Sequence, residues 1–278
     1  MAKDYTNPHL ARAAHLWAAL NNEDFNPSDS ENVIVMGKTG SGKSSIISLL
    51  LNKDIGVGHG LYSHTTKTME FDLDLATKHG VRQIKLIDTQ GVLDTKICLT
   101  EVLESLIDGL TGRFYHVNTI MLVLEGVRFT EDTQAALTSL CRIFGLNDVE
   151  RSKRLLVIVT KIEHLPTEKQ NDILKSVSEH DFFKKLGISE VYVRNNTIQA
   201  FGGPSQGLSP ILASAYEQLR QESKEKLLCM LEQRNSPMTV SNDFAQKLMN
   251  FLTNNIETVS ATAEIALEAF LNVVIDRE

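Results

Sequence analysis

One glycine-rich segment constrains the fold of this chain more than any other feature. Residues 37–44 read GKTGSGKS and match the pattern G-x-x-x-x-G-K-[ST]. The segment follows the β-branched run Val33–Met36, which predicts a buried strand, and opens Ser44–Leu51, which predicts a helix. A strand, a tight turn and a helix in this order present backbone N–H groups and a helix dipole to phosphate oxygens. The sequence therefore predicts a phosphate-binding α/β domain.

Two side chains of the segment have specific roles in this interpretation. Lys43 is expected to reach the β- and γ-phosphates of a nucleotide, and the Ser44 hydroxyl to ligate Mg²⁺. The competing interpretation is a glycine-rich turn that matches by chance, and the flanking strand and helix argue against it. The residues expected to line the phosphates are Gly37, Lys38, Thr39, Gly40, Ser41, Gly42, Lys43, Ser44 and Ser45.

Strand and helix patterns alternate along the rest of the domain. Met69–Leu75 alternates apolar and acidic residues and predicts a half-exposed strand. The stretch from it to the next strand is too short for a helical crossover, so we expect an antiparallel edge strand. Together the patterns predict an α/β, Ras-like fold: a mostly parallel six-stranded sheet with one antiparallel edge strand and helices on both faces. The other strands are expected at Ile84–Ile87, Val117–Leu124, Leu155–Val159 and Val191–Val193, and helices at Glu131–Phe144 and Thr167–Leu186.

Changes in composition predict three regions. Residues 1–30 read as an N-terminal helical segment, residues 31–235 as the α/β domain and residues 236–278 as a C-terminal helical extension. The net charge of -7 argues against nucleic-acid binding through a broad basic face. Three widely spaced cysteines indicate reduced thiols, and no apolar run is long enough to span a bilayer, so we expect a cytoplasmic protein. Peripheral association with membranes stays open.

Two further segments are expected near the phosphates. Ile84–Ile87 leads into Asp88, Gln90 and Gly91 of a D-x-x-G pattern, which places a carboxylate beside Mg²⁺ and a glycine N–H near the γ-phosphate. The alternative is an ordinary strand-to-turn aspartate. Between this pattern and the glycine-rich segment lies a threonine-rich stretch, in which Thr66 is expected to close over the metal, with Thr65 as the second choice. A polar loop is the competing interpretation of that stretch.

The residues after Leu155–Val159 are expected to select the base. Thr160, Lys161 and Glu163 stand where many GTPases have N-K-x-D. A carboxylate there accepts two N–H groups of guanine, and adenine lacks a donor at the matching ring nitrogen. The alternative is a polar strand end followed by a loop. The pair Asn195 and Asn196 is expected either near the guanine carbonyl or in an ordinary turn.

The chain resembles the immunity-associated GTPases, also called the GIMAP or avirulence-induced family, which are relatives of septins and chloroplast-import GTPases. The resemblance spans residues 31–228 and implies guanine-nucleotide binding and dimerisation across the nucleotide face or a neighbouring helix. Gln90 stands where the family usually has Pro, and His164 lies near a position where some members have Asp, so either Glu163 or His164 could face the guanine. The residues that carry it are GKTGSGKSS at 37–45, TTKT at 65–68, LVLEGVRFTE at 122–131 with IFG at 143–145, and the pair at 195–196.

The hydrolytic residue is the least defined part of the site. Ras-type switches place a water-orienting Gln directly after D-x-x-G, where this chain has Val92. We therefore expect slow hydrolysis, with Gln90 or Arg128 as candidate catalytic groups, or a residue from a partner subunit. Arg128 has a second interpretation, which we favour, as an anchor of the loop before the helix at 131–144.

Three functions are compatible with these features. The first is a switch protein that binds GTP or GDP with Mg²⁺, hydrolyses GTP slowly and forms a homodimer through the nucleotide face. The second is a GTP-dependent scaffold without hydrolysis, and the third, ranked last, is an ATP-using enzyme. Effector proteins and a membrane surface are open as partners.

Overall fold

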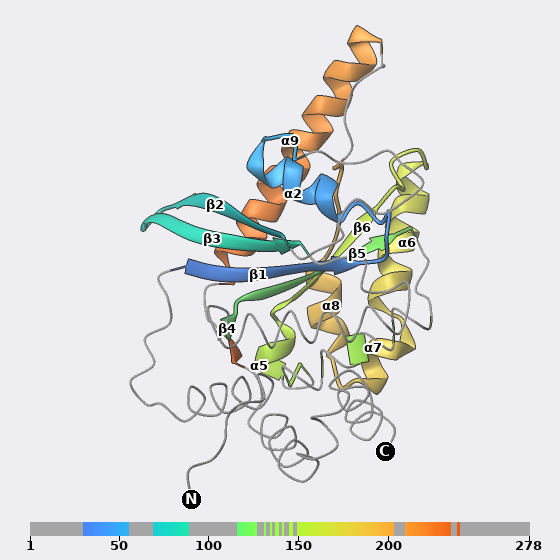
Figure 1. The fold of residues 1–278 in the computed structure, drawn as a ribbon. Helices are drawn as coiled ribbons and strands as arrows, with labels where there is room; N and C mark the ends of the chain where they lie inside the picture. The colour runs from blue at the N-terminus through green and yellow to red at the C-terminus, as the bar shows by residue number, and fades with distance from the viewer. Residues whose placement is uncertain are drawn as a thin grey trace, which may run out of the picture.

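The computed structural model describes residues 30–55, 69–88, 116–126, 131, 134, 137–138, 141, 145–146, 149–202, 209–234 and 238–239. Within them, six strands form one sheet in the order β2-β3-β1-β5-β6-β7 (Figure 1). Five strands are parallel, and β2 alone is antiparallel to its neighbour. The predicted fold class is confirmed. The strands are β1 (Ser30–Gly37), β2 (Met69–Thr77), β3 (Gly80–Asp88), β5 (Thr119–Glu125), β6 (Leu155–Thr160) and β7 (Thr197–Gln199).

Side-chain patterns explain the places of the strands in the sheet. Strand β2 buries Leu73 and Leu75 while its acidic residues face solvent, as expected for an edge strand. Strands β5 and β6 each have a neighbouring strand on both sides, and β6 is buried along its whole length. Parallel strands covered on both faces are continuous apolar runs, which is the pattern found at Leu155–Val159.

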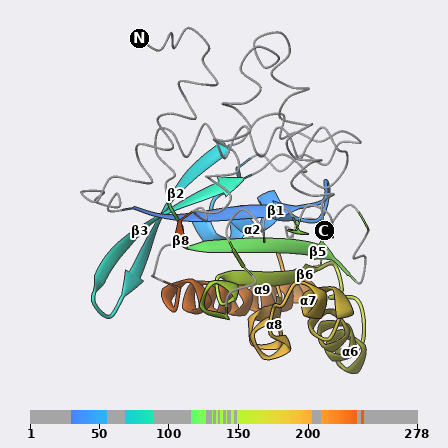
Figure 2. The ribbon, with the colours of Figure 1, turned by 90° about the horizontal axis from the view of Figure 1, so that it is seen from below.

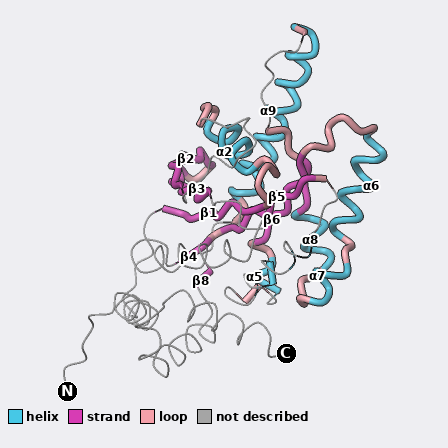
Figure 3. The backbone as a smooth tube through the Cα atoms, turned by 45° about the vertical axis from the view of Figure 1, so that its right-hand side comes forward, coloured by secondary structure: helices cyan, strands magenta, loops and turns pink. Residues whose placement is uncertain are grey.

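Helices cover both faces of the sheet. In Figure 1, α2 (Lys43–Leu51) and α9 (Pro210–Glu232) lie above it, and α9 extends beyond the sheet. On the other face α8 (Glu190–Asn196) packs against β6, and α6 (Thr167–Ser178) packs against α8 and β7. Figures 2 and 3 show α6, α8 and α7 (Asp181–Lys185) gathered on the β6 side of the sheet, and Figure 3 shows α5 (Val149–Ser152) near α8. No described helix has the length and apolarity needed to cross a bilayer.

The main core lies between α2, α9 and one face of the sheet. Ile46 and Leu50 of α2 are fully buried there, as are Leu227 and Leu231 of α9. The core therefore holds α2, the helix that follows the glycine-rich segment, firmly against the sheet. The helix expected at 131–144 is a separate element: its described residues are helical, and Leu137 among them is fully buried.

The strand expected at Val191–Val193 is wrong. These residues belong to α8, and the last strand of the sheet is β7, four residues further on. Val193 is 2% exposed whereas Val191 is 63% exposed, and a strand would have placed both on one face. Two β-branched residues favoured a strand, but packing of one helical face against β6 decides the structure.

The helix expected at Thr167–Leu186 is divided into α6 and α7. His180 separates them, and its Nδ1 accepts a hydrogen bond from the N–H of Phe182 at 3.2 Å, which caps the second helix. The break allows Phe182 and Phe183 to be buried, with their rings edge to face. Burial of two aromatic rings compensates for the lost helical turn.

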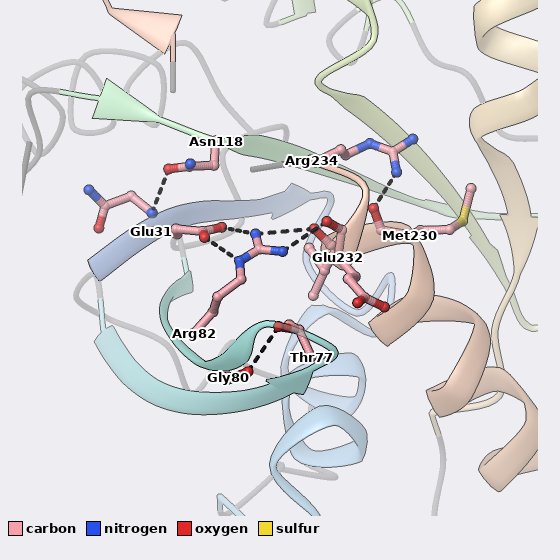
Figure 4. A network of polar contacts seen from close by, with 10 residues as sticks. Glu31, Thr77, Gly80, Arg82, Asn118, Met230, Glu232 and Arg234 are labelled. Atoms are coloured by element: carbon pink, nitrogen blue, oxygen red, sulfur yellow. Dashed lines mark hydrogen bonds and ion pairs between the residues drawn. The ribbon is translucent and has the colours of Figure 1, made fainter. Parts of the chain in front are cut away.

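Two arginines hold the C-terminal end of α9 in place (Figure 4). Arg82 of β3 pairs with Glu31 of β1 and donates to the carbonyl oxygen of Glu232 at 2.8 Å. Arg234 is buried and bonds to Asn196, and burial lowers its pKa to about 10. Carbonyls at the end of a helix favour such cations.

Two of the predicted regions lie largely outside the described residues. The segment 1–30 is described only at Ser30, which begins β1. In the extension expected to be helical at 236–278, the described residues are Met238–Thr239, which form strand β8 and pair with β4 (His116–Val117). Helix is therefore wrong for those two residues, and the boundary at 235 stays a prediction.

Candidate nucleotide-binding site

The glycine-rich segment closes tightly between the end of β1 and the start of α2. A Cβ atom on Gly37 would lie 2.3 Å from the carbonyl oxygen of Val123 in β5, so only glycine fits there. Gly42 has φ 101°, in the left-handed region, and is the N-cap of α2. A glycine N-cap has no side chain to cap the first turn, so the helix start can receive an anion instead.

Lys43 lies over the segment as expected for a phosphate-binding lysine. Its Nζ donates to the carbonyl oxygens of Gly37 and Lys38 at 3.0 and 3.2 Å. The side chain is almost fully buried, so its ammonium group sits inside the turn, where a polyphosphate would need a positive charge.

The end of β3 meets the start of α2 at a pair of oxygens. Asp88 is 1% exposed, and its Oδ2 accepts a hydrogen bond from Ser44 Oγ at 2.9 Å. Its Oδ1 has no hydrogen-bond partner among the described residues, and neither has the buried Oγ of Ser41. The structure therefore brings together the two metal ligands predicted at Ser44 and Asp88, with a carboxylate oxygen still to be satisfied.

The electrostatics of Asp88 suit a divalent cation. Burial raises the pKa of its carboxyl group, while the Lys43 ammonium and the Ser44 hydroxyl act in the opposite direction. A buried carboxylate with an unsatisfied oxygen is costly. Mg²⁺ prefers hard oxygen ligands, commonly one or two from the protein, so these residues fit the ion. In this site Mg²⁺ would neutralise charge on the phosphates.

Thr160 has a different role from the base contact expected of it. Its hydroxyl donates to the carbonyl oxygen of Ser41 at 2.6 Å and lies 3.2 Å from that of Leu124. Its side chain also lies beside Gly42, where an added Cβ would meet the threonine methyl carbon at 3.6 Å. Thr160 therefore ties the glycine-rich segment to β5 and β6.

The other two residues of this motif are more exposed than Thr160. Lys161 has φ 59° and its Nζ lies 3.2 Å from Glu125 Oε1, an ion pair at the surface. Glu163 is half-buried, and His164, the alternative base acceptor, is exposed. Both lie in the turn after β6 at the same edge of the sheet as the glycine-rich segment, so the base contact stays a prediction.

The structure does not bring Asn195 and Asn196 to this site. They end α8 and precede β7, whereas a parallel strand presents its carboxyl end to the nucleotide edge. The Asn196 amide donates to the carbonyl oxygen of Lys153 at 3.4 Å, before β6 begins. The pair thus lies at the amino-terminal ends of the parallel strands, because it comes directly before β7. The glycine-rich segment lies at their carboxyl ends.

Phe201 and Gly202, rather than the two asparagines, lie at the carboxyl ends of the parallel strands beside the glycine-rich segment. They follow β7, and a Cβ on Gly202 would lie 3.0 Å from the Cβ of Ser45. Their signal in the sequence was Gly202, which comes shortly after the short run Thr197–Gln199. Of the other predicted site residues, Thr66, Gln90, Gly91 and Arg128 lie outside the described residues.

Known proteins match this chain over the same region. The AIG1 family profile matches residues 31–206. Immune-associated nucleotide-binding protein 3 of Arabidopsis thaliana is 28% identical over 116 residues, which are 41% of this chain and 34% of that protein. Immune-associated nucleotide-binding protein 5 of the same plant is 30% identical over 152 residues, 53% of this chain and 46% of that protein. The matched stretch thus spans less than half of either relative.

Solved structures are similar at lower identity. Toc33 from Arabidopsis thaliana, in complex with Mg²⁺ and GMPPNP, is 14% identical with a TM-score of 0.47, and the match covers 83% of this chain and 95% of that one.

Proposed function

The chain belongs to the AIG1 family, and from this premise we propose that it is a guanine-nucleotide switch that binds GTP or GDP with Mg²⁺. One observation carries the proposal. A lysine lies inside a glycine-rich turn, and a serine–aspartate pair beside it leaves one buried carboxylate oxygen unsatisfied. The names of the curated relatives, which describe nucleotide-binding proteins, agree with it.

We call the glycine-rich segment at residues 37–45 and the neighbouring Asp88 the cradle. Each of its side chains contributes a defined interaction in this proposal. Lys43 would exchange its contacts with the loop carbonyls for contacts with β- and γ-phosphate oxygens. The first N–H groups of α2 would donate to the same phosphates. Ser44 and Asp88 would hold Mg²⁺, directly or through water, and Thr66 would join them in the GTP form.

Displacement of a fluorescent GDP tests nucleotide binding. Lys43→Ala is expected to lower affinity by about ten- to a hundredfold, because a charge-assisted contact to phosphate is lost from a buried site. Lys53→Ala is the matched control, since this lysine is exposed beyond the other end of α2. Equal binding by both variants would remove the proposed phosphate site.

Competition among GTP, ATP and XTP tests base selection. GTP is expected to compete best, and Glu163→Asn to weaken GTP and improve XTP, because xanthine offers a carbonyl where guanine has an amine. Stronger binding of ATP than of GTP would end the guanine assignment. Unchanged selectivity in Glu163→Asn would move the base acceptor to another residue, with His164→Ala as the next variant.

We further propose that hydrolysis is slow and depends on a homodimer formed through the nucleotide face. Val92 stands where Ras-type switches carry the water-orienting Gln. A missing group of that kind can be supplied by a partner subunit, and an arginine supplied in this way raises the rate by roughly 10³–10⁵. Gln90 and Arg128 are the candidates within the chain.

Single-turnover hydrolysis at increasing protein concentration distinguishes this mechanism from a non-hydrolysing scaffold. A rate constant that rises with concentration supports a catalytic dimer. A slow rate independent of concentration supports catalysis within one chain, and Gln90→Ala and Arg128→Ala then identify the group. The absence of turnover at every concentration favours the scaffold. The scaffold is the second candidate function because Val92 stands where Ras-type switches carry the water-orienting Gln.

A further inference from the structure

The turns that follow β5 and β6 are joined at the carboxyl ends of the parallel strands. Glu125 and Thr160, the last residues of these two strands, are register partners. The N–H of Gly126 donates to the carbonyl oxygen of Thr160 at 3.0 Å, and a Cβ added to Gly126 would lie 3.9 Å from the Cγ2 of Ile162. Since Ile162 is buried, each turn limits the movement of the other.

Lys161 has a backbone conformation that lysine rarely adopts. Its φ of 59° lies in the left-handed region, which only Asn52 shares among the described non-glycine residues. Asn52 is the C-cap of α2, near a helix end where asparagine is common, whereas lysine has no such preference. The conformation of Lys161 is therefore imposed by the residues on either side of it. The Thr160 hydroxyl donates to the carbonyl oxygen of Ser41 at 2.6 Å, and Ile162 is buried.

Glu125 binds the other end of the Lys161 side chain. Its Oε1 lies 3.2 Å from the Lys161 Nζ, and both side chains are partly exposed. Glu125 belongs to the segment LVLEGVRFTE at residues 122–131, and none of the nucleotide contacts proposed above involves it. The Lys161 side chain is thus held at its backbone and at its ammonium group, with the apolar stem between them.

We propose that Glu125 is a positioning residue of the guanine site: it binds the Lys161 ammonium group and so holds the lysine stem over one face of the base. This inference rests on the proposed function. Thr160 bonds to the glycine-rich segment and Lys161 comes directly after it, so a base attached to phosphates bound in that segment lies beside the lysine. A free lysine side chain would lose conformational entropy on covering the ring, and the pair with Glu125 orders the side chain before the nucleotide binds. Every purine offers such a ring face, so this contact strengthens binding without selecting guanine.

Removal of the Glu125 charge tests the inference. Glu125→Gln keeps the size of the side chain and is expected to weaken GDP and IDP equally, by about threefold, as for a partly exposed ion pair. Pyrophosphate, which has no base, is expected to bind this variant and the unmodified protein with the same affinity. Glu150→Gln in α5 is the matched control, because Glu150 pairs with Lys153 at 2.7 Å before β6 begins, at the other ends of the strands. That variant should bind all three ligands as the unmodified protein does.

A double-mutant cycle separates positioning from a general effect on the two turns. Lys161→Met keeps an apolar stem without the ammonium group, and in that background Glu125→Gln should have no further effect on GDP. Raising NaCl from about 0.1 M to about 1 M should remove the difference between Glu125→Gln and the unmodified protein, because salt screens an exposed pair. An equal loss for pyrophosphate, a loss that persists in Lys161→Met or at high salt, or unchanged or tighter binding of GDP would overturn the inference. The proposed function fails separately, if the unmodified protein shows no Lys43-dependent binding of GDP.

Discussion

Replacement of Thr160 by valine measures how strongly the glycine-rich segment is anchored. The substitution keeps shape and volume but removes a buried hydroxyl that donates to Ser41 O at 2.6 Å. A lost buried hydrogen bond that leaves its acceptor unpaired costs about 1–2 kcal/mol. For a domain of this size each kcal/mol lowers Tm by roughly 2–4 °C, so Tm should fall by about 2–8 °C.

Thermal unfolding gives Tm and urea unfolding gives the free energy, and both are measured on nucleotide-free protein, because bound ligand would add its own stabilisation. Thr77→Val is the matched control: its hydroxyl donates to Gly80 O at 2.9 Å in an exposed turn, where water can replace the bond. That variant should stay within about 0.5 kcal/mol of the unmodified protein. Equal losses for the two variants would refute the idea that burial of the Thr160 bond anchors the segment.

Three further predictions concern the proposed metal site, the glycine-rich segment and the attachment of α9. Asp88→Asn should abolish the Mg²⁺ dependence of GTP affinity yet stabilise the nucleotide-free protein at pH 7, because burial raises the Asp88 pKa and penalises its charged form. That gain should shrink as pH falls through the folded pKa, and a gain independent of pH would contradict it. Gly37→Ala should lose fluorescent-GDP binding, since its Cβ would lie 2.3 Å from Val123 O; retained affinity would contradict this. Arg82→Lys should lower the unfolding free energy by about 1–3 kcal/mol in urea titration, since lysine cannot form both hydrogen bonds to Glu31. An unchanged midpoint would show that the two-bond pairing of Arg82 with Glu31 does not stabilise the fold.

Local patterns were sufficient for the phosphate cradle and most of the sheet. The segment from Gly37 to Ser44 holds its glycines, lysine and serine within eight consecutive residues, and Lys43 folds back onto the carbonyl oxygens of Gly37 and Lys38, so the pattern could be recognised from the sequence. Strand β2 follows the same logic, because period-two alternation has one structural solution at a sheet edge.

The role of Thr160 depended on a contact that is distant in sequence. Its bonding partner, Ser41, is 119 residues away, and nothing near Thr160 indicates that its hydroxyl faces a carbonyl rather than a base. A residue type and a motif position predict which atoms are available. Only the packing of β6 beside the cradle decides which atoms they meet.

The position of the last strand also depended on contacts that local sequence patterns do not show. Val191–Val193 has strand propensity, but α8 buries one side of that segment against β6, and the strand forms at Thr197–Gln199. This shift moves the asparagine pair to the edge away from the cradle. The sequence by itself determined the glycine-rich turn with its lysine and serine, because one short segment contains all of these residues. The place where the base is expected lies among β6, β7 and α9, and only the tertiary structure decided how these elements meet, because their contacts join residues far apart in the chain.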